Sequence, residues 1–192
     1  MATKPADART ALATRQAATE VAEQAPPTIG QRIARLQGDF QLAMPRGMEA
    51  TRLVRDALTC LRTIRNLDRC DPDSVLGALM TCAQLGLRPG VLGHAWPLPF
   101  WDGRTQGYRA QLVIGYQGYI ELGYRSGQIK SLIARSVHAS DYFDVDYGLA
   151  DSLVHKPNLK GPRGEVIAYY AIAKFISGGH SFIVMTVPEM EE

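Results

Sequence analysis

The spacing of apolar residues changes near residue 90, and this change limits the folds open to the chain. Before it, apolar residues recur every three or four positions in three segments: 29–44, 49–66 and 72–85. After it, short runs alternate between apolar and polar residues and are bounded by glycine, proline and aspartate. The first spacing is typical of helices with one buried face, and the second is typical of strands. The sequence therefore predicts an α+β fold, in which N-terminal helices precede a small antiparallel sheet with one inserted short helix.

The ends of the third helix are marked by residues that favour helix termini. Asp71 can accept a hydrogen bond from a backbone N–H of the first turn, and Pro72 lacks the N–H that would be left without a partner. Gly86 suits the left-handed conformation in which many helices end. We therefore expect a helix between Asp71 and Gly86.

The second half of the chain predicts strands joined by tight turns. The expected strands are 94–101, 111–116, 128–138, 142–147, 165–175 and 180–187, and a short helix is expected over 119–126. Asp102 and Gly103 are typical of a hairpin turn between the first two strands. The segment with His155 and Lys156 is expected to be a loop, because it lies between two apolar strands and contains prolines.

The domain organisation is predicted from composition. Residues 1–28 are rich in alanine, threonine, glutamine and charge, so we expect a disordered tail. Residues 29–192 are expected to form one folded domain. The sequence from Thr186 to Glu189 resembles the capped start of a helix, yet the chain ends at Glu192. We therefore expect the domain to be truncated at its C-terminal end.

Composition excludes several classes of protein. No apolar run reaches the roughly 20 residues that a membrane helix needs, and the N-terminus lacks the apolar core of a signal peptide. The three cysteines form no CxxC pair, and the four histidines have no ligand spacing. We expect a cytoplasmic protein with free thiols, no membrane partner and no resident metal.

A glycine-rich stretch, LVIGYQGYIELGYRSGQIKS at residues 112–131, raises the question of a phosphate site. It lacks the GK[ST] tripeptide of a P-loop and the spacing of a dinucleotide fingerprint. It lies in a segment, residues 104–140, that contains five cations and a single acid, Glu121. Such a segment suits a polyanion, although a solvated basic face that binds nothing is the alternative for any one cation. Tyrosines in this stretch can stack on unpaired bases, so a single-stranded nucleic acid is the favoured ligand, with Tyr116 and Arg125 as the best candidates.

Two further patterns bear on function. In the strand VIAYYAIAKF, Lys174 shares a face with Ala168, Tyr170 and Ile172, and burying a lone lysine is costly. That face is therefore expected to be open, to cover a partner or to border a groove. Asp144 and Asp146 share a strand face at a spacing that some metal nucleases use, but a polar edge strand is the favoured interpretation. No GxSxG motif or local Cys–His pair is present.

The order of motifs resembles the RecT family of phage single-strand annealing DNA recombinases. The motifs are AQLGLRPG, GHAWPLPF, QLVIGYQGYIELGYRSGQI, DYFDVDYGL, LVHKP, YAIAKF and SGGHSFIVMT, and the similarity runs from about Phe40 to the last residue. Gln117 stands where the family often has arginine, and His155-Lys156-Pro157 matches a basic motif. With the resemblance, the predicted DNA-binding residues are Arg109, Tyr116, Gln117, Arg125, Lys130, Arg135, Lys156, Tyr170 and Lys174.

The resemblance implies a DNA-binding and annealing function for the domain over residues 29–192, in the cytoplasm of a bacterial host or phage-infected cell. It implies a non-enzymatic protein that binds single-stranded DNA, anneals complementary strands without ATP to give duplex DNA, and assembles with itself into rings or helical filaments. A 5′→3′ exonuclease and a host single-strand-binding protein are the implied partners. No cofactor is implied, and Mg²⁺ is expected at most to modulate annealing. The alternatives are a non-annealing DNA-binding or structural phage protein on the same fold and, more distantly, a nuclease that uses Asp144 and Asp146.

Overall fold

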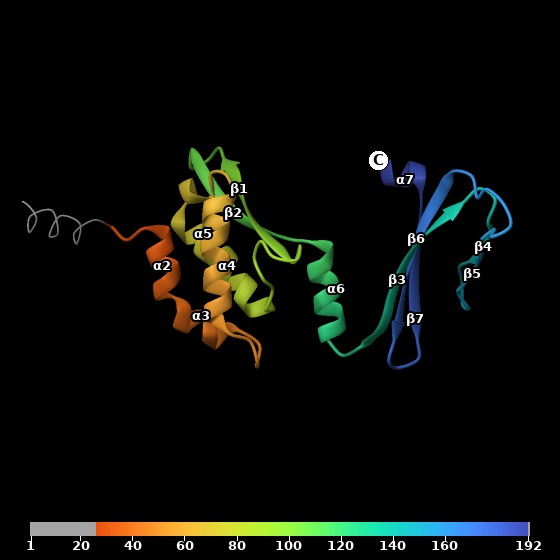
Figure 1. The fold of residues 1–192 in the computed structure, drawn as a ribbon, viewed down its shortest axis with the longest axis horizontal. Coiled ribbons are helices and arrows are strands. Elements are labelled where there is room, and N and C mark those ends of the chain that lie inside the picture. The colour runs from red at the N-terminus through yellow and green to blue at the C-terminus, as the bar shows by residue number, and fades with distance from the viewer. Residues whose placement is uncertain (1–25, 192) are drawn as a thin grey trace, which may run out of the picture. The chain divides into compact units, whose positions relative to one another are not determined.

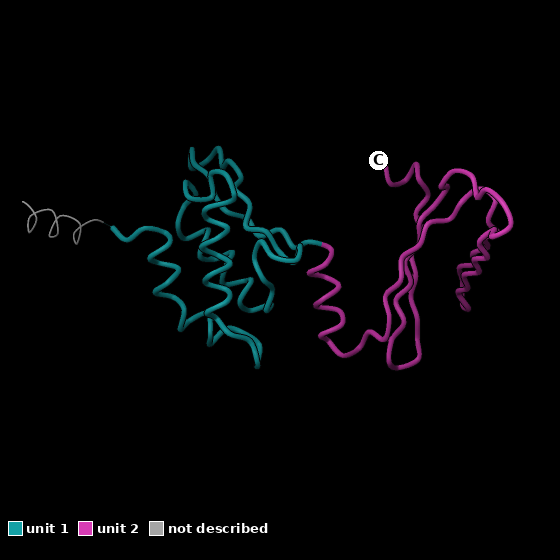
Figure 2. The backbone as a smooth tube through the Cα atoms, in the orientation of Figure 1, with its two compact units in different colours: residues 1–115 teal, residues 116–192 magenta. Residues whose placement is uncertain are grey.

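The computed structural model describes residues 26–191, and the chain divides into two compact units. Unit 1 is residues 1–115 and unit 2 is residues 116–192 (Figure 2). The sequence predicted one domain over residues 29–192, so this division is a finding of the structure. The expected tail, residues 1–28, lies almost entirely outside the described residues.

Unit 1 consists of helices followed by one hairpin (Figure 1). Its helices are α2 (Ile29–Arg35), α3 (Gln37–Ala43), α4 (Ala50–Thr63), the 3-10 turn η1 (Leu67–Arg69) and α5 (Pro72–Leu85). The hairpin pairs β1 (Ala95–Asp102) with β2 (Gly107–Ile114) in antiparallel register. The predicted change from helical to strand spacing near residue 90 is confirmed.

The predicted helix over 29–44 is two helices, because the chain leaves helical geometry at Leu36, which has φ −82° and ψ 8°. The apolar spacing nevertheless continues across the break, since Ile33 and Phe40 are both fully buried. The apolar spacing therefore predicted which residues are buried, but it did not predict the break in the helix at Leu36. A capping box at Thr28 begins α2, where the Thr28 hydroxyl accepts from the backbone N–H of Gln31.

The predicted ends of α5 are confirmed. The Asp71 carboxylate accepts a hydrogen bond from the backbone N–H of Ser74 at 3.0 Å, and Pro72 is the first helical residue. Gly86 ends the helix with φ 60° in the left-handed region. The Ser74 hydroxyl also accepts from the backbone N–H of Ala110 in β2 at 2.9 Å, which ties the start of α5 to the hairpin.

The core of unit 1 lies between the helices and the hairpin. Its largest fully buried side chains include Ile33, Phe40, Leu53, Leu67, Val75, Leu79 and Leu87. All three cysteines, Cys60, Cys70 and Cys82, are free and buried in it. Burial raises the pKa of the Cys60 thiol to about 11 and that of the Cys82 thiol to about 12.

Unit 2 is a three-stranded antiparallel sheet with a helix before it and a hairpin beside it (Figure 1). The helix is α6 (Tyr116–Arg125). The sheet has the order β3 (Ile129–His138), β6 (Val166–Phe175), β7 (His180–Thr186). The hairpin pairs β4 (Tyr142–Asp146) with β5 (Ser152–Lys156), and the short helix α7 (Val187–Glu191) follows β7. The predicted α+β class is confirmed.

The segment with His155 and Lys156 is a strand, so the prediction of a loop there is wrong. Residues 152–156 pair with 142–146 as β5 and alternate between exposed and half-buried positions. Leu153 and His155 turn inward, and Phe143 and Leu153 pack against the buried residues of the main sheet. The strand was missed because only two of its five residues are apolar. Its strand conformation depends on pairing with β4, which the residues of the segment alone do not indicate.

The inner side of the hairpin carries a buried polar network around Asp141. The Asp141 carboxylate is fully buried and accepts hydrogen bonds from Arg163, His155 and the backbone N–H groups of His138 and Asn158. The Arg163 guanidinium and these donors hold the pKa of Asp141 well below its usual range. Since an ionised carboxylate only accepts hydrogen bonds, Nε2 of His155 carries the proton it donates at 3.1 Å. The network joins β3, β5 and the segment before β6.

The face of β6 that bears Lys174 is closed at one end and open at the other. Ala168 and Tyr170 are only 5% and 7% exposed, because Val137 and the β4–β5 hairpin cover them. The Tyr170 hydroxyl lies 3.1 Å from Nδ1 of His155. The expectation of an open face is therefore wrong at Tyr170. It holds at Lys174, which is exposed.

Candidate nucleic-acid interface

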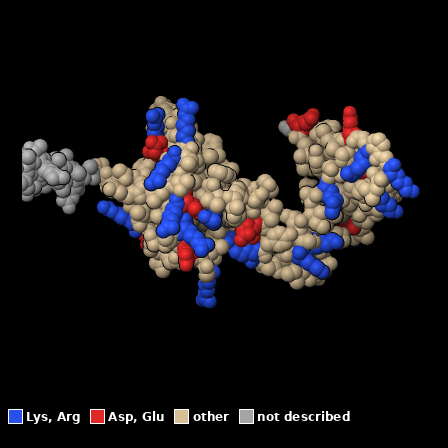
Figure 3. Space-filling view, viewed as in Figure 1, with Lys and Arg blue, Asp and Glu red and all other residues tan. Residues whose placement is uncertain are grey.

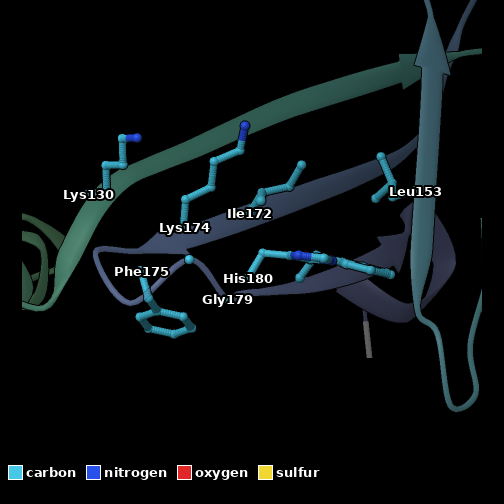
Figure 4. A pocket seen from close by; sticks show the side chains of 9 residues that line it. Lys130, Leu153, Ile172, Lys174, Phe175, Gly179 and His180 are labelled. Atoms are coloured by element: carbon cyan, nitrogen blue, oxygen red, sulfur yellow. The ribbon is translucent and has the colours of Figure 1, made fainter.

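A pocket of about 440 Å³ lies at the open end of the β6 face in unit 2 (Figure 4). Strands β3, β6 and β7, the turn between β6 and β7, and β5 all contribute to it. Its lining residues are Lys130, Leu153, Ile172, Lys174, Phe175, Gly178, Gly179, His180 and Phe182. None of these residues is acidic, so an anion entering the pocket meets only cationic, neutral and apolar groups.

Two lysines supply the positive charge of the pocket. Lys130 comes from β3 and Lys174 from β6, and both are exposed. Their side chains extend from the strands on the same side, whereas Phe175 points to the other (Figure 4). Lysine presents a flexible ammonium group that suits a phosphate as a point charge. The predicted residues Lys130 and Lys174 are thus brought together by the pairing of β3 with β6.

Aromatic rings lie beside these lysines. His180 and Phe182 are two residues apart on β7, so they share a face of the strand. Their ring centroids are 6.4 Å apart and their planes are parallel to within 9°. The Phe182 ring also contacts that of Tyr147 at 5.5 Å. His180 is exposed and Phe182 is half-buried, so the rings border the pocket and are also held by neighbours.

The β6–β7 turn explains why His180 meets Lys174. The strands are connected by Ile176, Ser177, Gly178 and Gly179, and Gly178 adopts φ 95°, which favours glycine. The turn sets the register so that Lys174 is paired with His180, and Ile172 with Phe182. Directly paired residues of antiparallel strands lie on the same face. A cation and an apolar residue therefore stand beside the two rings.

Sequence reasoning missed His180 and Phe182, although a signal for them existed. The alternation in HSFIVMT places both rings on one strand face, and the Ser-Gly-Gly turn places the start of that strand beside Lys174. Combining the two patterns would have paired them with the lysine.

Other predicted site residues lie elsewhere in unit 2. Tyr116 begins α6 and is 73% exposed, and its hydroxyl accepts a hydrogen bond from the Gln117 amide at 3.0 Å. Arg135 is exposed further along β3, paired with Tyr170. Lys156 is exposed on β5, with its Nζ 5.4 Å from the centre of the Tyr142 ring. None of these residues lines the pocket.

Arg125 and Arg109 complete the predicted set. Arg125 is half-buried in the last turn of α6. Arg109 belongs to β2 of unit 1, where its side chain is about half exposed and Nη1 lies 3.9 Å from the Asp102 carboxylate. The structure therefore unites only Lys130 and Lys174 of the nine predicted residues in one pocket, and places Tyr170 in the core.

The glycines of the stretch 112–131 have structural roles within the protein. A Cβ at Gly115 would lie 2.1 Å from the carbonyl oxygen of Gly93, and one at Gly123 would lie 2.9 Å from the Ile129 side chain. Gly127 adopts φ 70° just after α6. Close internal packing and a positive φ therefore account for three of the four glycines, without a phosphate.

The two units differ in lysine content, although both contain arginines. All eleven cations of residues 26–115 are arginines, and every lysine of residues 116–191 is one of Lys130, Lys156, Lys160 and Lys174. The exposed side of α4 bears Arg52, Arg55 and Arg62, and Figure 3 shows cations spread over this region of unit 1. Unit 1 thus has a basic surface of its own, distinct from the lysine pocket.

The acids of the nuclease alternative lie on the exposed side of β4. Asp144 and Asp146 both face solvent there. Among the described residues, no group of three or more His, Cys, Asp or Glu side chains could hold a metal ion. None of the helices within residues 26–191 is long and apolar enough to cross a membrane.

Fold and site together describe an α+β protein whose sheet carries lysines beside aromatic rings, a combination that suits a nucleic-acid strand. A family model described as "RecT family" matches residues 51–192. The chain belongs to the RecT family, which confirms the resemblance noted in the sequence.

Two relatives extend this comparison. "Protein RecT" of Escherichia coli (strain K12) is 43% identical over 152 residues, which are 78% of this chain and 56% of that protein. "Uncharacterized protein YqaK" of Bacillus subtilis (strain 168) is 28% identical over 156 residues, which are 76% of this chain and 49% of that protein. The chain therefore spans about half the length of each of these relatives.

Proposed function

We propose that the chain binds single-stranded DNA and anneals complementary strands without ATP, as a non-catalytic recombination protein of the cytoplasm. The observation that carries the proposal is the pocket of unit 2, in which Lys130 and Lys174 stand beside two aromatic rings. Membership of the RecT family supports it. Unit 1 has exposed arginines of its own, which also suit a polyanion.

Annealing makes and breaks no covalent bond, so it needs only charge neutralisation and stacking, which the side chains of the pocket can provide. Lysines neutralise phosphates, which lowers the repulsion between two strands and releases counterions. Stacking on aromatic rings is tolerant of sequence, since every base has a π-face. A strand held by charge and stacking keeps the hydrogen-bonding edges of its bases available to a second strand. Annealing of this kind requires neither a bound nucleotide nor a resident metal, and Mg²⁺ would act only by screening phosphates.

Assembly and partners belong to the same proposal. We propose self-assembly along DNA, a 5′→3′ exonuclease that exposes the strand, and contact with a host single-strand-binding protein. These rest on the family resemblance. The second candidate function is DNA binding without annealing. A protein of this kind would bind single-stranded DNA in the same way but would not speed the pairing of complementary strands.

The test measures binding and annealing separately. Fluorescence anisotropy of a labelled oligonucleotide should show log affinity falling with log salt, by about 0.7 for each phosphate neutralised on a single strand. Lys130→Gln and Lys174→Gln should each weaken binding and reduce this slope, whereas Lys160→Gln, a lysine outside the pocket, should do neither. Annealing of complementary oligonucleotides is followed by fluorescence quenching without ATP. Salt-independent binding would overturn the DNA-binding proposal, and binding without faster annealing would favour the second candidate.

A further inference from the structure

We propose that the pocket of unit 2 takes one nucleotide of a single strand together with its base. In this arrangement Lys130 and Lys174 hold the phosphate, and His180 with Phe182 forms the surface on which the base stacks. The inference rests on the proposed function and divides the site into base-contacting and phosphate-contacting parts.

The rings are suited to a base by orientation and by support. Their planes are parallel to within 9°, so a planar base can lie parallel to both. Phe182 is held by its contact with Tyr147 at 5.5 Å, and Ile172 is paired with it across the sheet. Rings that are already fixed lose little rotamer freedom when a base stacks on them. The exposed ring of His180 offers the accessible surface.

The cations lie within the reach of a single nucleotide. Lys174 is directly paired with His180, and paired side chains of antiparallel strands have Cβ atoms roughly 4.5–5.5 Å apart. Lys130 enters the same pocket from β3. A phosphate beside these ammonium groups would place its own base next to the His180 ring.

The dimensions and composition of the pocket fit this occupant. Its volume of about 440 Å³ lies in the range of roughly 300–1,000 Å³ typical of small-ligand sites. Besides Phe175 and two glycines, the lining combines two cations, the rings of His180 and Phe182, and two aliphatic side chains, and it contains no carboxylate. This composition complements a group that is anionic at one end and flat and apolar at the other.

The experiment compares two oligonucleotides of equal length and charge. One carries normal bases, and the other carries tetrahydrofuran residues in place of the nucleosides. The variants are His180→Ala, His180→Phe, Phe182→Leu, Lys174→Gln and, as a matched control, Ser181→Ala, whose side chain lies on the opposite face of β7. Circular dichroism confirms that each variant is folded.

We expect base-specific effects from the ring variants alone. His180→Ala should lower affinity for the base-bearing strand by about tenfold, since a stacked base contributes roughly 1–3 kcal/mol, and should leave affinity for the abasic strand unchanged. Phe182→Leu should act in the same direction. His180→Phe should retain the preference for bases, because it keeps a ring without the imidazole. Lys174→Gln should lower the affinities for the base-bearing and the abasic strand by the same factor, and Ser181→Ala should change neither affinity.

Separate outcomes overturn the two proposals. If the wild-type chain binds neither strand, the proposed function fails. If it binds both strands with the expected salt dependence, but His180→Ala lowers both affinities equally or neither, the stacking surface is wrong and DNA binding stands. Loss of base preference in His180→Phe would also overturn the stacking role, because the ring would then not be what the base requires.

Discussion

Replacing Gly115 by alanine tests whether this glycine serves packing inside unit 1. The added Cβ would lie 2.1 Å from the Gly93 carbonyl oxygen and 3.2 Å from the Gly93 carbonyl carbon, whereas side-chain Cβ atoms are essentially never closer than 3.0 Å to a neighbour. The two backbone segments must therefore separate by about an ångström. That movement strains the hydrogen bond from the Gly115 N–H to the His94 carbonyl oxygen, which is 3.0 Å long.

The expected loss of stability in Gly115→Ala is the sum of the overpacking and of the strained hydrogen bond. Overpacking of this kind costs typically about 1–3 kcal/mol, and a lost backbone hydrogen bond adds about 1 kcal/mol. A total of roughly 2–4 kcal/mol should lower Tm by at least about 10 °C in a unit of this size. The assay is tryptophan fluorescence during heating of the whole chain, because both tryptophans, Trp96 and Trp101, lie in β1 of unit 1.

A second glycine variant gives the opposite expectation. Gly77 lies in the interior of α5, and a Cβ there would have no neighbour within 4 Å. Gly77→Ala should therefore raise the stability of unit 1 by roughly 1 kcal/mol through helix propensity. A Gly115→Ala chain that melts at the wild-type temperature refutes the packing argument. If that chain also loses DNA affinity, Gly115 serves a phosphate, as the sequence first indicated.

Two further predictions concern buried titratable groups. The Cys60 and Cys82 thiols, with pKa values of about 11 and 12, should resist alkylation at neutral pH until unit 1 unfolds, and mass spectrometry that finds them rapidly modified in the native chain would contradict their burial. For Asp141, whose pKa is held low by Arg163, the stabilisation is present above the unfolded-state value of about 3.9 and is lost as the pH falls below it. Asp141→Asn should therefore be less stable than wild type at neutral pH, with the difference shrinking below about pH 4 in denaturant titrations followed by circular dichroism; a constant difference would show that the carboxylate charge is not what matters.

Local patterns predicted the helices and most strands, because their signals lie within each segment. The cap at Asp71 and the end at Gly86 are set by side-chain and backbone chemistry inside one or two turns. The strand β5 was missed because it is stabilised by pairing with β4 and by inward packing of Leu153. The division into two units likewise depends on long-range contacts that no local pattern encodes.

Two of the predicted site residues, Lys130 and Lys174, line the candidate pocket. Lys130 and Lys174 stand out because charge on an apolar strand is conspicuous in sequence. Tyr170 was grouped with Lys174 since both lie on one face of β6, but the hairpin covers only one end of that face. His180 and Phe182 were not predicted because only the register of β6 with β7 places them beside Lys174 and Ile172. That register joins residues of different strands and cannot be seen within one segment.

Because the described part of unit 1 contains no lysine, reagents and proteases that act on lysine treat the two units differently. A protease that cuts after lysine has no site between Lys4 and Lys130, so α2 to α6 and both tryptophans remain on a single fragment. Acylating reagents that modify lysine will likewise leave the described part of unit 1 unlabelled. If the pocket holds a DNA strand, adding that strand should slow the labelling of Lys130 and Lys174 relative to that of Lys156 and Lys160 in the wild-type chain.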